Sequence, residues 1–309
     1  MTPDIKIGFI GLGEMGIHMA ANLQTYLVSQ SLPSITVWNR TQEKAAPVQA
    51  LGAHVADTVD ELVERSNVIF TCLSNDAVVE TMYEQLFALV KRQDSPVTFV
   101  DTSTIYPSLP KKLAEDLAQI SPMHTYLQCP VFGRPPAAKA AQLVWVASGD
   151  AKAIERLNPY FMAMSKSIID LKTSDVSRGS ALKLLGNFFI VGSVELLAEG
   201  FNFAERANLD KEAVLTWVRT VFPAPPWIGY SQIIADGSMA KAGGFAADLG
   251  LKDVNHMRQL ASESGAYLPS ADLAQKHLQT VHEKGMGDQD WTAILHVVRE
   301  MSEPKNREE

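Results

Sequence analysis

The stretch Gly11-Leu-Gly-Glu-Met-Gly16 constrains the fold of this chain more than any other sequence feature. It directly follows an apolar run at residues 5–10 and opens a helical pattern over residues 16–29. In this context Gly11 permits a tight turn, Gly13 lets the backbone approach a pyrophosphate, and Gly16 allows the helix to pack closely. A helix N-terminus also offers free N–H groups and a partial positive charge to phosphates. We therefore predict a dinucleotide site formed by Gly11, Leu12, Gly13, Glu14, Met15 and Gly16; the alternative is a glycine-rich turn without a ligand.

The first half of the chain alternates short apolar runs with helical patterns. Such alternation is typical of crossover units and predicts a doubly wound, mostly parallel sheet with helices on both faces. The strands are expected at residues 5–10, 35–38, 67–72, 97–100, 143–147 and 167–171. Two of the helices between them are expected at residues 16–29 and 77–90.

The second half has a different pattern, with helical segments and no convincing strand. Helices are expected near residues 180–207, 210–220, 228–236, 245–264, 270–284 and 290–301. The run Pro223-Ala-Pro-Pro-Trp227 is interpreted as a loop between helices. The fold class is therefore α/β followed by an all-helical domain, with expected domains at residues 1–175 and 176–309.

Composition excludes several classes of protein. The 309 residues include 27 Lys and Arg against 35 Asp and Glu, a net charge of −8, which gives no support for a nucleic-acid partner. The two cysteines, Cys72 and Cys129, lie too far apart for a disulfide scaffold or a CxxC metal site, and we expect a reducing, cytoplasmic location. No uninterrupted apolar run approaches the roughly 20 residues that span a bilayer, so no membrane partner is expected. The seven histidines show no HExxH pattern, and no metal site is predicted.

The end of the second expected strand predicts which dinucleotide binds. NAD-selective sites usually carry Asp or Glu there to hold the ribose hydroxyls. This chain has Trp38-Asn39-Arg40-Thr41 instead. Arg40 would form charge-assisted hydrogen bonds with a 2′-phosphate, and Asn39 and Thr41 would add neutral donors. We predict NADP(H) as the cofactor; the alternative is that Arg40 only solvates a loop.

Two further strand ends face the same predicted crevice, because ligands of open parallel sheets bind beyond the carboxyl ends of the strands. Leu73 and Ser74 follow one strand, and Thr102 and Ser103 follow the next. These four residues are candidates to line the cofactor. For any one of them, capping of the following helix is the alternative, and Ser74 and Asn75 are natural N-caps.

One helix face in the second half carries residues suited to chemistry. Gly179, Lys183, Gly186 and Asn187 are spaced i, i+4, i+7 and i+8 and therefore share a face. A glycine inside a helix costs about 1 kcal/mol relative to alanine, so two on one stripe indicate a close approach by another element. That element is either a ligand or simply a neighbouring helix.

At this point the sequence resembles a known family. The glycine turn, Asp101-Thr-Ser-Thr104, the face of Gly179, Lys183 and Asn187, and Lys252-Asp253 are together similar to the β-hydroxyacid dehydrogenases. These include 3-hydroxyisobutyrate dehydrogenases and share the NAD-binding domain type of 6-phosphogluconate dehydrogenase. The resemblance implies a Rossmann-like domain, a helical domain for substrate binding and dimerisation, and a homodimer or tetramer. It also implies hydride transfer between NADP(H) and a small hydroxy or oxo acid or semialdehyde.

The resemblance implies roles for individual residues as well. Lys183 would be the proton donor and acceptor, and Asn187 would help to hold the substrate. Lys252 would lie near the nicotinamide, and Ser103 would contact both cofactor and substrate. The chain departs from the family at Pro130-Val-Phe-Gly-Arg134, where the family has a Ser-Gly-Gly turn for the substrate carboxylate.

This departure leaves the substrate open. Phe132 would add an apolar wall beside Gly133, and Arg134 would either bind a carboxylate or face solvent. Imine reductases and reductive aminases resemble the same architecture, but they commonly replace the helix lysine that this chain keeps as Lys183. A non-catalytic dinucleotide-binding module is the third interpretation, and retention of Lys183 and Asn187 argues against it.

Overall fold

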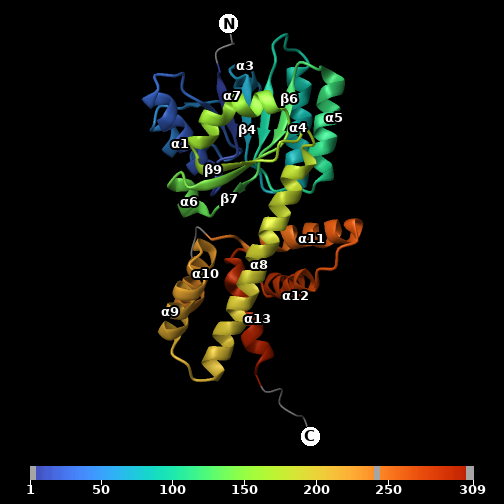
Figure 1. Ribbon diagram of the computed structural model, residues 1–309. Coiled ribbons are helices and arrows are strands. Elements are labelled where there is room, and N and C mark those ends of the chain that lie inside the picture. Colours follow the sequence, from blue (N-terminus) through green and yellow to red (C-terminus); the bar gives the residue numbers. More distant parts are fainter. Residues whose placement is uncertain (1–4, 240–243, 304–309) are drawn as a thin grey trace. The chain divides into compact units, whose positions relative to one another are not determined.

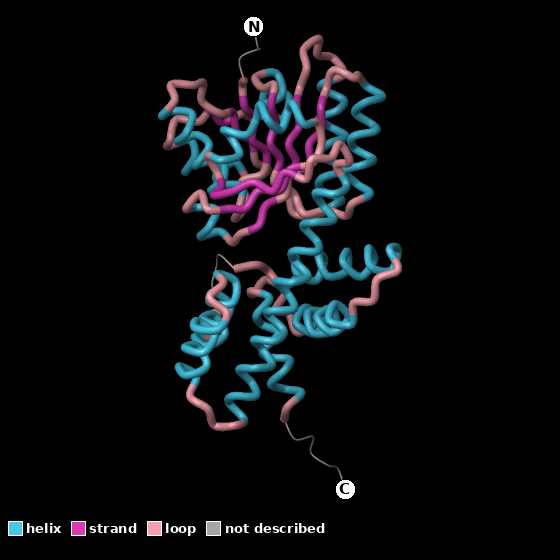
Figure 2. Tube along the Cα trace, in the orientation of Figure 1, coloured by secondary structure: helices cyan, strands magenta, loops and turns pink. Residues whose placement is uncertain are grey.

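The structure is a computed structural model that describes residues 5–239 and 244–303. The chain divides into two compact units, one ending at Lys183 and the other beginning at Leu184 (Figure 1). The first unit contains all the named strands, and the second is built from helices (Figure 2). The predicted fold class is therefore confirmed, whereas the expected domain boundary at 175/176 stays a prediction.

The first unit is built on a six-stranded parallel sheet with the order β3-β2-β1-β4-β5-β6. Its strands are β1 (Ile7–Ile10), β2 (Thr36–Trp38), β3 (His54–Val55), β4 (Val68–Thr71), β5 (Thr98–Asp101) and β6 (Thr125–Gln128). The strand β1 pairs with both β2 and β4, so the chain order reverses at this point. In a doubly wound sheet this is where a ligand crevice opens beyond the strand ends.

A second, three-stranded sheet corrects one expectation. It contains β7 (Val131–Phe132), β8 (Leu143–Ala147) and β9 (Ser165–Asp170) in that order. The sequence analysis assigned residues 143–147 and 167–171 to one parallel series with the earlier strands, but they pair with each other and with the antiparallel β7. The strands β3, β6 and β7 were missed, because runs of two to four residues carry too little periodicity.

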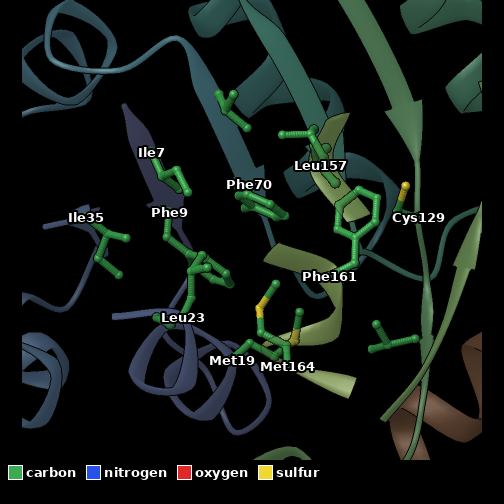
Figure 3. Packing of buried hydrophobic residues seen from close by; sticks show 14 of the residues in the cluster. Ile7, Phe9, Met19, Leu23, Ile35, Phe70, Cys129, Leu157, Phe161 and Met164 are labelled. Carbon is green, nitrogen blue, oxygen red and sulfur yellow. The ribbon is translucent and has the colours of Figure 1, made fainter. Parts of the chain in front are cut away.

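Helices cover both faces of the parallel sheet, and successive strand residues point to opposite faces. Phe9 of β1 packs in one core and the adjacent Ile10 in the other. Figure 3 shows the first core, in which Phe70 of β4 lies near Phe161. The helices of this unit are α1 (Gly16–Ser29), α2 (Ala46–Gln49), α3 (Val59–Glu64), α4 (Asp76–Val90), α5 (Ser108–Ile120), α6 (Pro135–Lys139) and α7 (Ala151–Met162), with the 3₁₀ turn η1 (Gln42–Ala45).

The second unit follows the expected helical pattern closely. It contains most of α8 (Ser177–Arg206), then α9 (Lys211–Val221), α10 (Pro225–Asp236), α11 (Ala247–Ser264), α12 (Pro269–Glu283), the 3₁₀ turn η2 (Trp291–Ala293) and α13 (Ile294–Met301). The expected loop at Pro223–Trp227 is wrong in its second half. Pro225 opens α10, because proline fits the first helical turn, where its missing N–H has no partner to lose.

Helix α8 bears on the expectation that there is no membrane partner, which stays a prediction. Within residues 5–239 and 244–303 it is the one helix whose length and composition would allow it to cross a membrane. Half of its most apolar window is buried, and buried core helices meet the same criterion. The sequence analysis looked for an uninterrupted apolar run, whereas this helix is apolar on average and includes scattered Gly, Ser and Asn.

Candidate active site

The glycine turn between β1 and α1 has two glycines that the fold itself requires. Gly11 has a φ of 97°, and a Cβ on it would overlap the carbonyl oxygen of Cys72. A Cβ on Gly16 would overlap the carbonyl oxygen of Gly11. Gly13 differs, because a Cβ there would meet no described atom within 4 Å. The middle glycine therefore faces open space, as expected where the backbone approaches a ligand.

The start of α1 fits an anionic group. The Met15 side chain does not cap this helix, and in the first turn Ile17 N donates to Gly13 O at 3.1 Å and His18 N donates to Met15 O at 3.2 Å. The turn is braced from the side, since Leu12 N donates to Asn39 Oδ1 at 2.8 Å. A helix start behind an open glycine has the partial positive charge and the space that suit a pyrophosphate.

The end of β2 places the three predicted selectivity residues in one turn. Arg40 and Thr41 are exposed, and residues 38–41 contain no carboxylate. Asn39 has a structural role that the sequence did not indicate, because its Oδ1 accepts from Leu12 N and its Nδ2 donates to Thr41 O at 2.8 Å. Arg40 is therefore the cationic group at this strand end.

The ends of β4 and β5 are tied together. Leu73 N donates to Ser103 Oγ at 2.9 Å, and Thr102 Oγ1 donates to Thr71 O at 2.7 Å. Ser103 and Thr102 are buried, whereas Ser74 is exposed. Of the two natural caps, Asn75 caps α4 by accepting from Val78 N at 3.0 Å.

Asp101 organises these strand ends, and the sequence analysis gave it no role. Its Oδ1 accepts from Thr71 Oγ1 at 2.9 Å and from Ser103 N at 3.0 Å, and its Oδ2 accepts from Tyr126 OH at 3.2 Å. The side chain is fully buried. Burial raises the pKa of the Asp101 carboxyl, and the hydrogen bonds from Ser103 and Thr71 oppose that rise. The available signal was the acidic residue at the start of Asp101-Thr-Ser-Thr104.

Lys183 lies on α8 at the end of the first unit and is 8% exposed. Its Nζ lies 4.4 Å from the centroid of the Phe132 ring, which belongs to β7. Of the other residues predicted beside it, Gly133 is exposed with a φ of 141°, and Arg134 is partly buried just before α6. The structure thus brings together Lys183, from the helix face that begins at Gly179, and Phe132, from the segment 130–134 in which the chain differs from the family.

In the second unit a carboxylate joins two of the predicted residues. Asn187 Nδ2 donates to Asp253 Oδ2 at 2.7 Å, and Lys252 Nζ lies 3.0 Å from Asp253 Oδ1. Asn187 and Asp253 are buried, and Lys252 is largely buried. The sequence analysis quoted Asp253 in a motif but assigned it no function. Its carboxylate orients the Asn187 amide and balances the charge of Lys252.

Lys252 also lines a groove of about 500 Å³ along α11. Asn255 and His256 line the same groove from that helix, and His282 lines it from α12. His256 follows Lys252 by four residues on α11, and this spacing places both side chains on the groove. Among the described residues no group of three or more His, Cys, Asp or Glu side chains is arranged to hold a metal ion.

Comparison with known proteins identifies the family of this chain. Residues 6–173 match the NAD-binding domain of 6-phosphogluconate dehydrogenase, and residues 177–298 match the NAD-binding model of NADP-dependent 3-hydroxyisobutyrate dehydrogenase. The chain belongs to the β-hydroxyacid dehydrogenase family. It is accordingly an oxidoreductase that uses a nicotinamide dinucleotide.

Relatives in this family span nearly the whole chain. An uncharacterized oxidoreductase of Bacillus subtilis, YfjR, is 32% identical over 96% of this chain and 100% of its own length. The NADH-dependent oxidoreductase ucdB of Aspergillus ustus is 31% identical over 92% of this chain and 96% of its own.

Solved structures share the fold. A 3-hydroxyisobutyrate dehydrogenase from Salmonella typhimurium aligns with a TM-score of 0.83 at 21% identity, covering 95% of this chain and 100% of that one. Imine reductases share the fold at lower scores, such as 0.62 for the enzyme from Pseudomonas sp., which is 20% identical and aligns over 95% of this chain and 99% of its own.

The different surroundings of Gly13 and Gly11 predict different effects of a single methyl group. Gly13→Ala is expected to leave the melting temperature within about 2 °C and to weaken dinucleotide binding at least about tenfold, because the added Cβ enters only the space where the phosphates approach. Thermal unfolding and fluorescence titration with NADPH measure the two effects.

The matched variant is Gly11→Ala, which is expected to lower the melting temperature because its Cβ overlaps backbone at a positive φ. If Gly13→Ala binds NADPH as well as the unchanged protein does, the glycine turn is not the phosphate site.

Proposed function

We propose that this protein is an NADPH-dependent reductase and dehydrogenase that interconverts a carbonyl group, in a semialdehyde or oxo acid, and the corresponding hydroxy acid. The observation that carries the proposal is a buried lysine, Lys183 on α8, in the same compact unit as the glycine turn. Burying a charged amine is costly, so a lysine kept in such a place usually has a function.

Lys183 acts as the proton donor and acceptor. A bound nicotinamide supplies the hydride for carbonyl reduction and takes it back in the reverse reaction. As the carbonyl is reduced, negative charge develops on its oxygen, and the Lys183 ammonium stabilises that charge and donates a proton. In oxidation the neutral amine accepts the hydroxyl proton.

Asn187 and Lys252 supply the polar contacts for substrate and cofactor. Asn187 donates from its amide nitrogen to Asp253, and this bond orients the amide that would help to hold the substrate. Lys252 provides positive charge in the α11 groove, and Asp253 keeps that charge from being unbalanced in a largely buried place.

The preference for NADPH rests on Arg40. An exposed guanidinium at the end of β2, with no carboxylate at residues 38–41, suits a 2′-phosphate and would meet no repulsion from the protein there. The relative from Aspergillus ustus is NADH-dependent, whereas the second family model is that of an NADP-dependent dehydrogenase, so the two cofactors both occur in the family.

The substrate is tested by a panel of semialdehydes, 2-oxo acids and cyclic imines, assayed side by side by NADPH absorbance. Turnover of carbonyl substrates supports the proposal. Preferential turnover of imines would instead make the protein an imine reductase, a class that shares the fold and for which the apolar Phe132 ring is suitable.

A homodimer is also part of the proposal. Helix α8 exposes Phe189, Leu196 and Phe203, which are 65%, 59% and 69% exposed and seven residues apart on one face. Such an apolar stripe on a helix is typical of a contact between protein chains.

Loss of the Arg40 guanidinium is expected to reduce the preference for NADPH. In Arg40→Ala, kcat/KM for NADPH should fall about 10- to 100-fold while kcat/KM for NADH changes less than about threefold, because the charge-assisted bonds involve only the 2′-phosphate. Steady-state kinetics with both cofactors measure the ratio.

Arg92→Ala, an exposed arginine beyond the opposite end of α4, is the control and should leave that ratio unchanged. Equal efficiency of NADPH and NADH in the unchanged protein would contradict the proposed preference.

Removal of the Lys183 amine is expected to stop the chemistry and spare cofactor binding. Lys183→Met should lower kcat by about 10²- to 10⁴-fold, the usual contribution of a positioned acid or base, with the NADPH dissociation constant unchanged. Stopped-flow turnover and equilibrium titration separate the two effects. Lys166→Met, an exposed lysine on β9, serves as the control, and full turnover by Lys183→Met would remove this lysine from the mechanism.

Charge on the α8 stripe is expected to separate the dimer. The double variant Leu196→Glu, Phe203→Glu should sediment as a 33.8 kDa monomer, because two buried carboxylates would each cost more than the apolar contact contributes. Analytical ultracentrifugation measures the mass, with Lys211→Glu as a control for added negative charge. A monomeric unchanged protein would refute the dimer.

A further inference from the structure

The Phe132 ring lies against the ammonium that the proposed reaction uses. The distance of 4.4 Å between Lys183 Nζ and the ring centroid is well inside the range of about 6 Å over which a ring attracts a cation. This attraction strengthens where water is excluded, and Lys183 is 8% exposed. The contact therefore has the two features, short distance and burial, that make it energetically significant.

The backbone holds the Phe132 ring in place. Phe132 pairs with Val144 in the antiparallel ladder between β7 and β8. The next residue, Gly133, has a φ of 141°, and a Cβ there would come within 2.5 Å of Leu143 Cδ2. Phe132 therefore leaves the sheet in a direction that the chain on either side fixes.

Lys183, the other residue of this contact, is also held in place near β8. One helical turn before Lys183, Gly179 N donates to Ser148 Oγ at 3.1 Å. Ser148 directly follows β8 and forms a bridge with Gln128 at the end of β6. A Cβ at Gly179 would lie 2.6 Å from Ser148 Oγ and 2.8 Å from Gln128 O, so the helix packs tightly at this point. Both the ring and the ammonium thus depend on β8 for their positions.

From this arrangement we propose that Phe132 is a positioning residue for the reaction, whose π face holds the Lys183 ammonium in place for proton transfer. The proposal rests on the role of Lys183 put forward above and adds a partner that the sequence analysis treated only as an apolar wall. A ring positions a cation without accepting its proton or forming an ion pair with it. The ring itself therefore takes up none of the ammonium protons, whereas a carboxylate in the same position would compete with a substrate oxygen for one.

The test changes the electrostatics of the ring and leaves its shape nearly constant. Phe132 is replaced by 4-fluoro-, 3,5-difluoro- and 3,4,5-trifluorophenylalanine in the full-length protein, because each fluorine withdraws charge from the π face. We expect kcat to fall stepwise, by about 3- to 10-fold over the series, with the KM for NADPH unchanged. Phe132→Tyr should retain kcat within about twofold, and Phe132→Leu, an apolar side chain without a π face, should lose as much as the trifluoro variant.

A second readout needs no substrate. The ring stabilises the ammonium over the free amine, so weakening its π face should raise the rate at which Lys183 is acylated by an amine-reactive ester by about 3- to 10-fold. Mass spectrometry of the tryptic peptide that begins after Arg178 measures this rate, with exposed Lys166 as the internal reference.

The outcomes separate the two proposals. If Lys183→Met retains turnover, the proposed mechanism fails whatever the fluorine series does. If Lys183→Met is inactive but kcat and the acylation rate are flat across the series, Phe132 is only a packing residue and the present inference is overturned.

Discussion

The position of the proposed catalytic lysine depends on how α8 begins. Gly179 N donates to Ser148 Oγ, and the same hydroxyl lies 3.0 Å from Gln128 O. The contact is possible only because residue 179 has no side chain, since a Cβ would lie 2.8 Å from that carbonyl oxygen. Glycine lowers the stability of a helix, but its lack of a side chain permits this contact. The contact fixes the start of α8 one turn before Lys183. The close approach at Gly179 is made by Ser148, just after β8, and Gln128, at the end of β6, and not by the neighbouring helix that was the expected alternative to a ligand.

The strand ends of the first unit are held by buried polar groups instead of apolar packing. Asp101 receives three hydrogen bonds from groups on β4, on β6 and in the turn after β5. A buried carboxylate is favourable only where its oxygens are satisfied, so the network fixes the relative heights of the strand ends. Ser103, which this network orients, in turn accepts from Leu73 N. The Asp101 carboxylate, which lies within the same unit, thereby fixes the positions of these predicted cofactor-lining residues.

Much of this fold was predictable from sequence, and the failures have physical causes. The glycine turn was recognisable because the fold requires residues without a side chain at fixed places between a strand and a helix. Gly11 and Gly16 satisfy this requirement, since a Cβ on either would overlap backbone atoms. Helix α1 and the helices after Lys183 followed from long periodic patterns. The second sheet was missed because a two-residue strand such as β7 has no pattern of its own. The carboxylates of Asp101 and Asp253 were not assigned, because hydrogen-bond partners distant in sequence leave no mark on local spacing.

Helix α8 imposes a constraint that holds whatever the arrangement of the two compact units. Lys183 closes the first unit and Asn187 belongs to the second, yet they are separated by four residues of one continuous helix, a rise of about 6 Å. The proposed proton donor and the proposed substrate-binding amide therefore lie on successive turns of one helix, which sets the spacing of their backbones. The remaining freedom lies in the side chains. Each of these has its own partner within its own unit, the Phe132 ring for Lys183 and the Asp253 carboxylate for Asn187.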